Sequence, residues 1–478
     1  MSSVKKNFGY NLILTLSNYV FPLLTYPYVS RVLGLTNIGI CNFVDSLINY
    51  FVLFSMLGVG SYGVREIAKC KKSFLKRSYV ASNLFYINAI LTIVAILILL
   101  FLSFNVSEFV QYQKFFFVGV CKLIFNLFLI EWFFQGLQNF AYITKRSLVV
   151  RLVYVAAIFI FIRDENDALY YYALQVMIVV LNSVLNWNYA RNFFKLSLRF
   201  FHPQKFIASV ASFGYYRLLT SMYTTFNMVF LGFVCTTDEV GYFATATKLY
   251  SIIMSVFTAF TVVMVPRVSE MLKNREVEAL QDIANKTFGL MMPISVALIC
   301  YCLCCAPNII MLLAGQGYEG AIIPFRIVIF LLVVIGMEQV VIQQFLMASK
   351  SNKSILAVST LGAVVGVGLN VVLTPSLGAV GSSIAWGVSE MSVLFLGVRF
   401  MKKIMGINLD YRNIIKNMSF GLLYLMVLIP CHYLKLDFFF DLFVCGIVCS
   451  VSFLFVNMKI NPNPHLMNMI FNRIRIKK

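Results

Sequence analysis

Residues 80–104 read VASNLFYINAILTIVAILILLFLSF, a run of 25 residues without a charged side chain. A helix needs about 20 apolar residues to cross the hydrocarbon core of a bilayer. Lys76 and Arg77 precede the run and Glu108 follows it, so charged residues stand at both ends. Because the run is uniformly apolar and does not alternate, it predicts a helix and not a strand of a membrane barrel. The stretch therefore predicts an all-α membrane protein.

The composition of the whole chain agrees with this reading. Of 478 residues, 60% are hydrophobic and only 12% are charged, and the mean hydropathy is +0.84. A soluble domain is about half apolar and about a quarter charged. The chain has too little polar surface to cover a water-soluble globule, which excludes a cytosolic enzyme, a secreted disulfide scaffold and a disordered protein.

Long apolar stretches continue along the chain and are separated by charged or Gly-, Pro- and Asn-rich breaks. They predict about 14 transmembrane helices, with ends uncertain by a few residues. The predicted helices are 11–33, 38–63, 80–104, 114–135, 148–163, 169–190, 208–234, 241–266, 287–312, 324–347, 354–374, 381–401, 417–434 and 439–457.

With this number of helices, loops rich in Lys and Arg alternate along the chain with loops that are poor in them. With the N-terminus inside, and with Arg399 near a helix end counted with the adjoining loop, 30 of the 39 Lys and Arg residues fall in inside segments. The outside holds three, namely Lys114 and Arg163 at helix ends and Lys435 in a loop. This asymmetry follows the positive-inside rule and predicts that both termini are cytoplasmic. The net charge of +20 is then mainly a topology signal, and no nucleic-acid partner is needed to explain it.

The chain partly repeats itself at an offset of 202 residues. Ile38-Gly39 matches Val240-Gly241, and Arg65 matches Arg267. In each copy the Gly opens a helix and the Arg ends it, so the two copies start on the same side of the membrane. We expect two six-helix lobes and a C-terminal pair of helices. The predicted domains are 1–207 (helices 1–6), 208–416 (helices 7–12), and 417–478 (two helices and a basic tail that suits a solvated segment or a membrane-surface anchor).

Basic residues inside the predicted helices are the main candidates for substrate binding. Charges at bilayer depth are costly, so they tend to face a cavity or a partner. Arg217 and Lys248 lie too deep to reach the interface easily and share helical faces with hydroxyl residues. Lys122 follows from depth and helical phase, whereas Arg31 and Arg326 lie near helix ends and could equally snorkel to the interface. The predicted substrate-binding residues are Arg31, Lys122, Arg217, Lys248 and Arg326.

Acidic residues inside the predicted helices are candidates for gating or ion coupling. These are Asp45, Glu338 and Glu390, while Glu131 lies near an inner end and is read as interfacial. They could titrate to couple transport to H⁺ or Na⁺, but structural pairing with the bases is the commoner role. When Lys114, Arg163, Arg399 and Asp441 are counted with the adjoining loops, the spans hold six bases against four acids, which predicts a cavity that attracts an anion.

The sequence gives little support for a disulfide, a metal or cofactor site, or a catalytic centre. The 11 cysteines are read as apolar packing, and neither a metal site nor a cofactor is predicted. No Ser/His/Asp arrangement and no Gly-rich phosphate-binding loop for ATP occurs in the sequence. The chain is therefore predicted not to be an enzyme.

Several motifs carry a resemblance to a known family. Residues 26–34 read YPYVSRVLG, residues 62–69 read YGVREIAK, and residues 131–137 read EWFFQGL. Val240-Gly241-Tyr242-Phe243 follows later, with Lys248 one to two turns beyond. Together these segments resemble the O-antigen and capsular oligosaccharide flippases of the MOP superfamily, relatives of the MATE exporters and the lipid II flippase. The C-terminal third is similar in pattern only.

The resemblance implies two six-helix lobes around a cationic cavity that Arg31 and Lys248 face. It implies alternating access that carries an undecaprenyl-pyrophosphate-linked oligosaccharide from the cytoplasmic to the periplasmic leaflet of a bacterial inner membrane. Membrane lipids and possible coupling to H⁺ or Na⁺ complete the expected partners. The alternative is a MATE-like exporter of small cations, against which the basic excess argues. A membrane glycan polymerase or acyltransferase is a more distant rival, because it would need a large outer loop or a membrane His.

Overall fold

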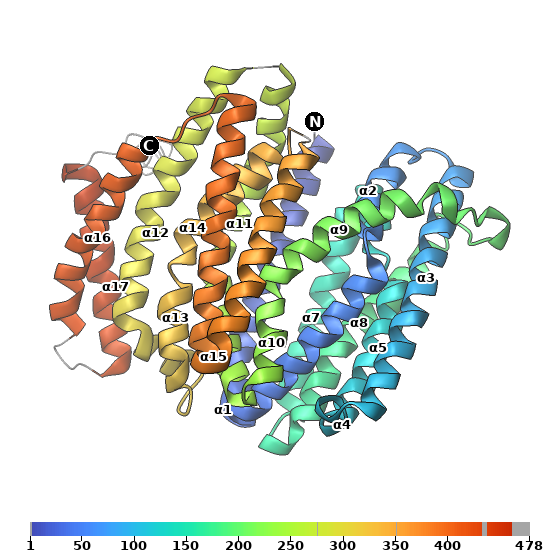
Figure 1. Cartoon of the computed structure of the whole chain (residues 1–478), viewed down its shortest axis with the longest axis horizontal. Coiled ribbons are helices and arrows are strands. Elements are labelled where there is room, and N and C mark those ends of the chain that lie inside the picture. Colours follow the sequence, from blue (N-terminus) through green and yellow to red (C-terminus); the bar gives the residue numbers. More distant parts are fainter. Residues whose placement is uncertain (1, 275, 350, 433–436, 461–478) are drawn as a thin grey trace. The chain divides into compact units, whose positions relative to one another are not determined.

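Helices make up nearly all of the regular structure of the protein (Figure 1). The structure is a computed structural model that describes residues 2–274, 276–349, 351–432 and 437–460. Within these ranges it contains no strand. A backbone in lipid must satisfy its own hydrogen bonds, and helices do so within one segment. The predicted all-α class is confirmed.

Spatial contacts divide the chain into two compact units. Unit 1 comprises the residues up to Ala244 together with Asn370–Gly378. Its helices are α1 (Ser2–Met56), α2 (Val59–Lys69), α3 (Phe74–Asn105), α4 (Ser107–Gln111), α5 (Gln113–Leu129), α6 (Glu131–Gly136), α7 (Phe140–Phe161), α8 (Ala168–Ala190), α9 (Ile207–Thr224) and α10 (Phe226–Val234), with the first residues of α11 (Thr237–Asn274).

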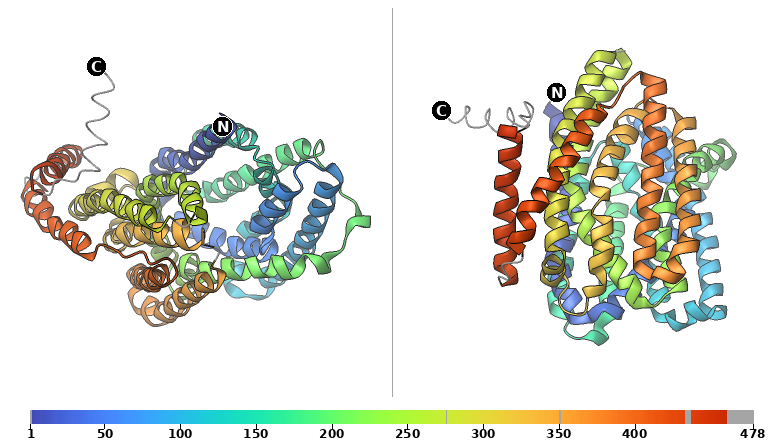
Figure 2. Two further views of the ribbon diagram at one scale, coloured as in Figure 1. Left: turned by 90° about the horizontal axis from the view of Figure 1, so that it is seen from above. Right: turned by 60° about the vertical axis from the view of Figure 1, so that its left-hand side comes forward.

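Unit 2 comprises Thr245–Leu369 and the residues from Ala379 onward. Within it, α12 packs against both C-terminal helices, which pair with each other (Figures 1 and 2). Its elements are the rest of α11, then α12 (Val277–Leu313), α13 (Ile322–Val328), α14 (Leu331–Glu338), the π-helix η5 (Gln339–Leu346), α15 (Asn352–Met405) except its segment Asn370–Gly378, α16 (Tyr411–His432), α17 (Phe438–Phe455) and a final π-turn (Val456–Ile460).

Two glycines break the longest helices where the sequence predicts a boundary. α1 and α15 are 55 and 54 residues long, whereas about 20 residues span a membrane. Gly34 has φ 74° within α1 and Gly378 has φ 54° within α15. Only glycine adopts this backbone region at little cost. Each long helix is therefore two helices, as the ranges 11–33, 38–63, 354–374 and 381–401 predict.

Helices occupy all fourteen predicted ranges, but several are interrupted. The helix predicted at 114–135 is divided into α5 and α6 at Ile130, and the one at 208–234 into α9 and α10 at Thr225. In the described part of the chain, nine helices are long and apolar enough to cross a membrane, or ten if the pair bent by 41° at 319–346 is one span. The figure of 14 crossings stays a prediction. Residues 433–434 of the helix predicted at 417–434 lie outside the described residues, as does the tail from 461 onward.

Residues that the repeat makes equivalent lie next to each other in unit 1. Thr36 Oγ1 donates to Asp238 Oδ1 at 2.6 Å, and these residues are 202 positions apart. A Cβ on Gly39 would lie 1.8 Å from Thr237 O and 3.2 Å from Gly241 N. Equivalent residues meet in this way when they lie close to the axis that relates two repeats. The contact supports the repeat, while the domain boundaries at 207 and 416 stay predictions.

Two of the motifs quoted above pack on each other. A Cβ on Gly63 would lie 2.4 Å from the Trp132 ring, and one on Gly136 would lie 2.8 Å from Ile67 Cβ. Phe133 and Phe134 are completely buried beside them. Small residues let helices approach closely where no hydrophobic effect drives them together in lipid. The motifs thus build the α2–α6 contact, and their conspicuous residues are structural.

Candidate functional site

A polar pocket of about 330 Å³ lies between the second half of α1 and α9 in unit 1. The Tyr50 hydroxyl donates to Ser221 O at 2.9 Å and joins the two helices at this place. An amide, several hydroxyls and a guanidinium meet here within predicted spans, where polar side chains commonly line a wet cavity. The lining residues are Asn49, Val52, Leu53 and Met56 from α1, and Tyr216, Arg217, Thr220, Ser221 and Thr224 from α9.

Arg217 supplies the positive charge of this pocket. Its side chain is exposed and makes no ion pair with any residue that the structure describes. The neighbouring hydroxyls of Thr220 and Thr224 donate to backbone carbonyls of α9 at 3.0 Å each. A Cβ on Gly60 would lie 3.7 Å from Arg217 Nη1, an ordinary van der Waals distance, so α2 also borders the guanidinium. Among these α9 residues, the Arg217 guanidinium is thus the donor group that remains available to a ligand.

Lys122 lies in the same unit but in a different electrostatic setting. Its Nζ is 2.5 Å from Asp45 Oδ1 and 2.9 Å from Asn49 Oδ1. Asn49 in turn donates to Asp45 Oδ2 at 3.0 Å. The triad joins α5 to α1, and the formal charges of Lys122 and Asp45 cancel within it. Because Asn49 also lines the Arg217 pocket, the triad forms a neutral polar neighbour of the free cation.

The other three predicted substrate-binding residues lie on separate elements. Lys248 is half-buried on α11, on the helical face that carries the buried Thr245 and Ser255. Arg31 donates to Pro27 O at 2.6 Å, and Arg326 donates to Leu303 O at 3.1 Å. Both arginines are exposed. The structure therefore groups only Arg217 and the Lys122 triad, and it places the other cations elsewhere within their units.

Glu338 and Glu390 meet in the interior of unit 2. Their carboxyl groups lie within hydrogen-bonding reach of each other. Trp386 Nε1 donates to Glu390 Oε1 at 2.8 Å, while the second oxygen of each carboxyl group is buried without a donor among the described residues. Two carboxylates this close repel when both are ionised, so a shared proton or a bound cation is needed between them. Glu338 ends α14, where the π-helix η5 begins, and such helices are frequent at functional sites.

One buried cation is missing from the sequence-based site. Arg146 has a side chain only 3% exposed and pairs with Glu131 at 2.5 Å. The predicted helix 148–163 excluded it, but α7 begins at Phe140 and carries Arg146 into the core. Lys145 and Arg146 fall between the predicted helices 114–135 and 148–163, so the loop charges predict that both lie in an inner loop. The acid in the EWFFQGL motif was the available signal that a basic partner existed.

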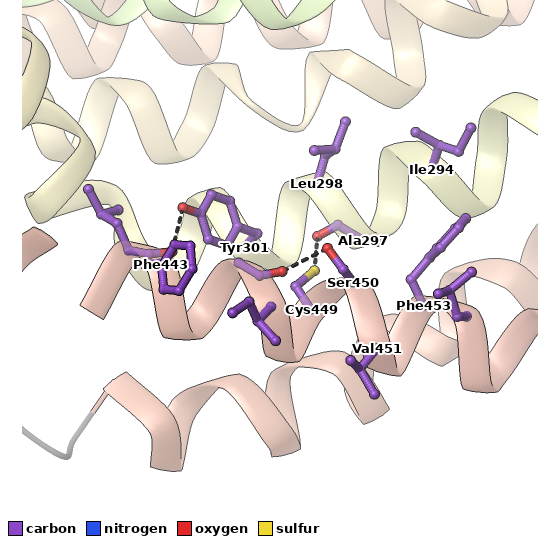
Figure 3. Close-up of a pocket in the computed structure, with 13 residues that line it drawn as sticks. Ile294, Ala297, Leu298, Tyr301, Phe443, Cys449, Ser450, Val451 and Phe453 are labelled. Atoms are coloured by element: carbon purple, nitrogen blue, oxygen red, sulfur yellow. Dashed lines mark hydrogen bonds between the residues drawn. The ribbon is translucent and has the colours of Figure 1, made fainter. Parts of the chain in front are cut away.

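An apolar groove of about 800 Å³ runs between α12 and α17 in unit 2 (Figure 3). The Tyr301 hydroxyl donates to Leu442 O at 3.1 Å, and Cys449 Sγ donates to Ala297 O at 3.4 Å, so polar atoms of the walls are satisfied internally. The remaining surface is aliphatic and aromatic, as Leu298 and Phe453 illustrate in Figure 3. Such a groove suits a hydrocarbon chain and no charged group.

The N-terminal half of the chain matches a known protein family. The family described as "Polysaccharide biosynthesis protein" matches residues 4–272, more than half of the chain. A protein of Escherichia coli (strain K12), described as a putative O-antigen transporter, is 23% identical over 410 residues. That alignment covers 84% of this chain and 97% of that protein.

Solved structures share the fold. The lipid II flippase MurJ in an inward closed conformation superposes with a TM-score of 0.77 at 13% identity, covering 94% of this chain and 98% of that one. An inward-facing multidrug resistance MATE family transporter of the MOP superfamily gives a TM-score of 0.61 at 15% identity, covering 83% and 98%. At these identities the likeness concerns the fold, and it agrees with a membrane protein of many spans.

Proposed function

Because the chain belongs to the polysaccharide biosynthesis protein family, we propose that it is a flippase for a lipid-linked oligosaccharide. The cargo is a glycan on polyprenyl pyrophosphate, carried from the cytoplasmic to the periplasmic leaflet of a bacterial inner membrane by alternating access of two six-helix lobes. Both termini are cytoplasmic in this proposal, since the loop charges divide in that sense. The similarity to a putative O-antigen transporter and to a lipid II flippase fold supports the proposal.

The free guanidinium of Arg217 is the observation that carries the proposal. The pyrophosphate that joins glycan and lipid is esterified at both ends and is therefore a compact dianion that needs fixed donors, and a guanidinium binds phosphate oxygens in a bidentate way. An unpaired cation in hydrocarbon would be costly, so this pocket must hold water or an anion. The hydroxyls and the Asn49 amide around it also suit sugar hydroxyl groups. Lys248, Arg31 and Arg326 are proposed as further contacts, and Lys122 as a support of the pocket wall.

The lipid part of the cargo has a separate place in unit 2. A polyprenyl chain is a branched hydrocarbon, and the groove between α12 and α17 offers mainly apolar surface to it. Burying each CH₂ group contributes roughly 0.8 kcal/mol when water is displaced. The gain is smaller when lipid is displaced, so we propose that the groove guides the tail and does not supply most of the affinity.

The carboxyl pair Glu338–Glu390 is proposed as the coupling element, together with Asp45 as a gating residue. Proton or Na⁺ binding between two facing carboxyl groups would remove their repulsion. The same pair is the feature that favours the alternative, an ion-coupled exporter of small cations. The alternative requires an accessible acidic cavity, whereas the exposed charge in the polar pocket is basic.

The proposal is tested by the Arg217→Ala variant in cells that depend on this chain for surface glycan. Hydrogen bonds to charged groups contribute about 1.5–3 kcal/mol, so we expect a loss of flipping of about ten- to a hundredfold at normal protein level. Arg217→Lys should retain part of the activity.

Arg412→Ala is the matched control, because Arg412 is an exposed arginine at the start of α16. It should leave surface glycan unchanged. Normal glycan in Arg217→Ala cells would remove this residue from the mechanism, and cation export without glycan transport would favour the alternative.

A further inference from the structure

Four side chains with metal-binding atoms converge in unit 2 from three helices. Cys305 lies on α12, His432 is the last residue of α16, and Asp441 and Cys445 lie one turn apart on α17. The two sulfur atoms and a carboxylate oxygen of Asp441 all lie within 4.8 Å of one another. His432 Nδ1 is 2.9 Å from Asp441 Oδ2, and Cys445 Sγ is 3.5 Å from Asp441 Oδ1.

The cluster is buried at a place where a carboxylate needs compensation. Cys305 and Cys445 are completely buried, and Asp441 is 2% exposed. Asn308 Nδ2 donates to Asp441 Oδ2 at 2.5 Å, and His432 is the base that reaches this carboxylate within the described part of the chain. A buried carboxylate without a full counter-charge is costly. A cation held by the surrounding donors would remove that cost.

Independently of any transported substrate, we propose that Cys305, His432, Asp441 and Cys445 bind one Zn²⁺ ion or a similar borderline metal ion. Zn²⁺ takes thiolate, imidazole and carboxylate ligands in a tetrahedron, with bonds of about 2.0–2.3 Å. Ligand atoms of such a site lie roughly 3.3–3.8 Å apart. The two sulfur atoms and the Asp441 oxygen, which lie within 4.8 Å of one another, therefore close around the ion with movements on the order of 1 Å. His432, whose Nδ1 lies against Asp441 Oδ2, supplies the fourth ligand when its ring turns toward the ion. Asn308 orients the carboxylate from behind, as second-layer donors do in metal sites.

A disulfide between Cys305 and Cys445 is the competing fate of the two thiols, which contact each other. A disulfide would join the two sulfur atoms but would not explain why Asp441 and His432 lie beside them. The convergence of four different donors on one place is what a metal ion requires and a disulfide does not. The geometry therefore favours the metal.

The site would fix the C-terminal helix pair to α12. Its ligands come from all three helices, so the ion would cross-link segments that are more than 100 positions apart in the sequence. Tyr301 and Leu442, which join the walls of the apolar groove, lie one turn before Cys305 and one residue after Asp441. Metal binding would hold this end of the groove at a constant width.

The test uses the purified full-length chain in detergent, stripped with a chelator and titrated with Co²⁺ and then Zn²⁺. We expect one metal ion per chain and the near-ultraviolet charge-transfer band of Co²⁺ bound to thiolate, displaced by Zn²⁺. Binding should strengthen as the pH rises, because the thiols lose protons to the solvent when the metal binds. Cys305→Ser, Cys445→Ser and Asp441→Asn should each weaken binding by at least roughly a hundredfold, more than the 10–100-fold typical of second-layer changes.

Cys302→Ser on α12 and Cys449→Ser on α17 are matched controls, since both are buried cysteines outside the cluster. They should bind the metal as the wild type does. If the cysteine variants do not accumulate, His432→Gln at the more exposed edge of the cluster supplies the same comparison. Absence of a stoichiometric thiolate band in the wild type, equal binding by cluster and control variants, or a Cys305–Cys445 disulfide found by mass spectrometry would each overturn the proposal.

Discussion

Arg217 and Lys122 are two cations within the predicted spans of unit 1, yet the structure gives them opposite settings. Lys122 is enclosed by Asp45 and Asn49 at 2.5 and 2.9 Å. Arg217 faces a pocket of about 330 Å³ and has no acidic partner in the described ranges. A paired charge holds helices together, whereas an unpaired charge attracts a ligand. The partner of each cation, and not its depth, separates Lys122, which is engaged by Asp45, from Arg217, which we propose binds the cargo.

The largest expected effect comes from breaking the pair. Lys122→Met leaves Asp45 as an uncompensated charge, and removing one partner of a buried pair costs about 3–5 kcal/mol. Asp45 and Lys122 are 26% and 16% exposed, so we expect a loss near 3 kcal/mol. Thermal unfolding in detergent and the yield of folded protein report this loss.

The double variant Asp45→Asn, Lys122→Met provides the control for that experiment. It removes both charges and should recover most of the stability, because a neutral pair leaves no buried charge. If Lys122→Met were as stable as the wild type but inactive in transport, Lys122 would join Arg217 as a binding cation and the contrast between them would fail.

A second prediction extends the comparison to the acids of unit 2. Glu338→Gln and Glu390→Gln each remove the repulsion between neighbouring carboxyl groups, and an amide oxygen can still accept from Trp386 Nε1. We expect stability to change by less than about 1 kcal/mol, while transport loses its dependence on an imposed proton or Na⁺ gradient. Proteoliposomes with defined gradients measure this, and Glu278→Gln, an exposed acid on α12, is the control. Unchanged gradient dependence in both variants would make the pair structural.

The smallest effect is expected at a cation that already has a backbone partner. Arg326 is exposed and donates to Leu303 O at 3.1 Å. Arg326→Gln keeps a donor and should change stability by less than about 0.5 kcal/mol. If the free energy of cargo binding changes by the same small amount, the affinity changes roughly twofold. Glycan export should therefore fall by no more than about twofold. A tenfold fall would show that Arg326 is a principal contact of the cargo and not a peripheral one.

The sequence predicts the helices well because their signal is local. Uniform apolar runs and the glycines Gly34 and Gly378 mark segments without reference to the rest of the chain. The start of α7 was missed because Arg146 has the appearance of a loop charge, and the groups that hold it in the core include Glu131 on α6 and the Asn182 carbonyl on α8. Burial of a charge depends on its partner, which the local pattern does not contain.

The candidate site was predictable only in part for the same reason. Depth and helical phase identify Arg217, Lys122, Glu338 and Glu390, but they do not indicate that Lys122 pairs with Asp45 or that the two glutamates meet. The cluster that we propose as a metal site was not predicted from the sequence. Cys305 and Cys445 are 140 positions apart and lie in apolar runs, where thiols normally pack as small hydrophobic side chains. Their convergence with Asp441 arises from the packing of α17 on α12.

The central claim is that Arg217 binds the anionic part of the cargo, and direct binding tests it most simply. The probe is a short-chain polyprenyl pyrophosphate, added to the purified chain in detergent at two salt concentrations. We predict that Arg217→Ala weakens binding at least tenfold, about 1.4 kcal/mol. The double variant Asp45→Asn, Lys122→Met and the single variant Arg412→Ala should have little effect on binding. Equal affinity of the wild type and Arg217→Ala for the pyrophosphate would contradict the central claim.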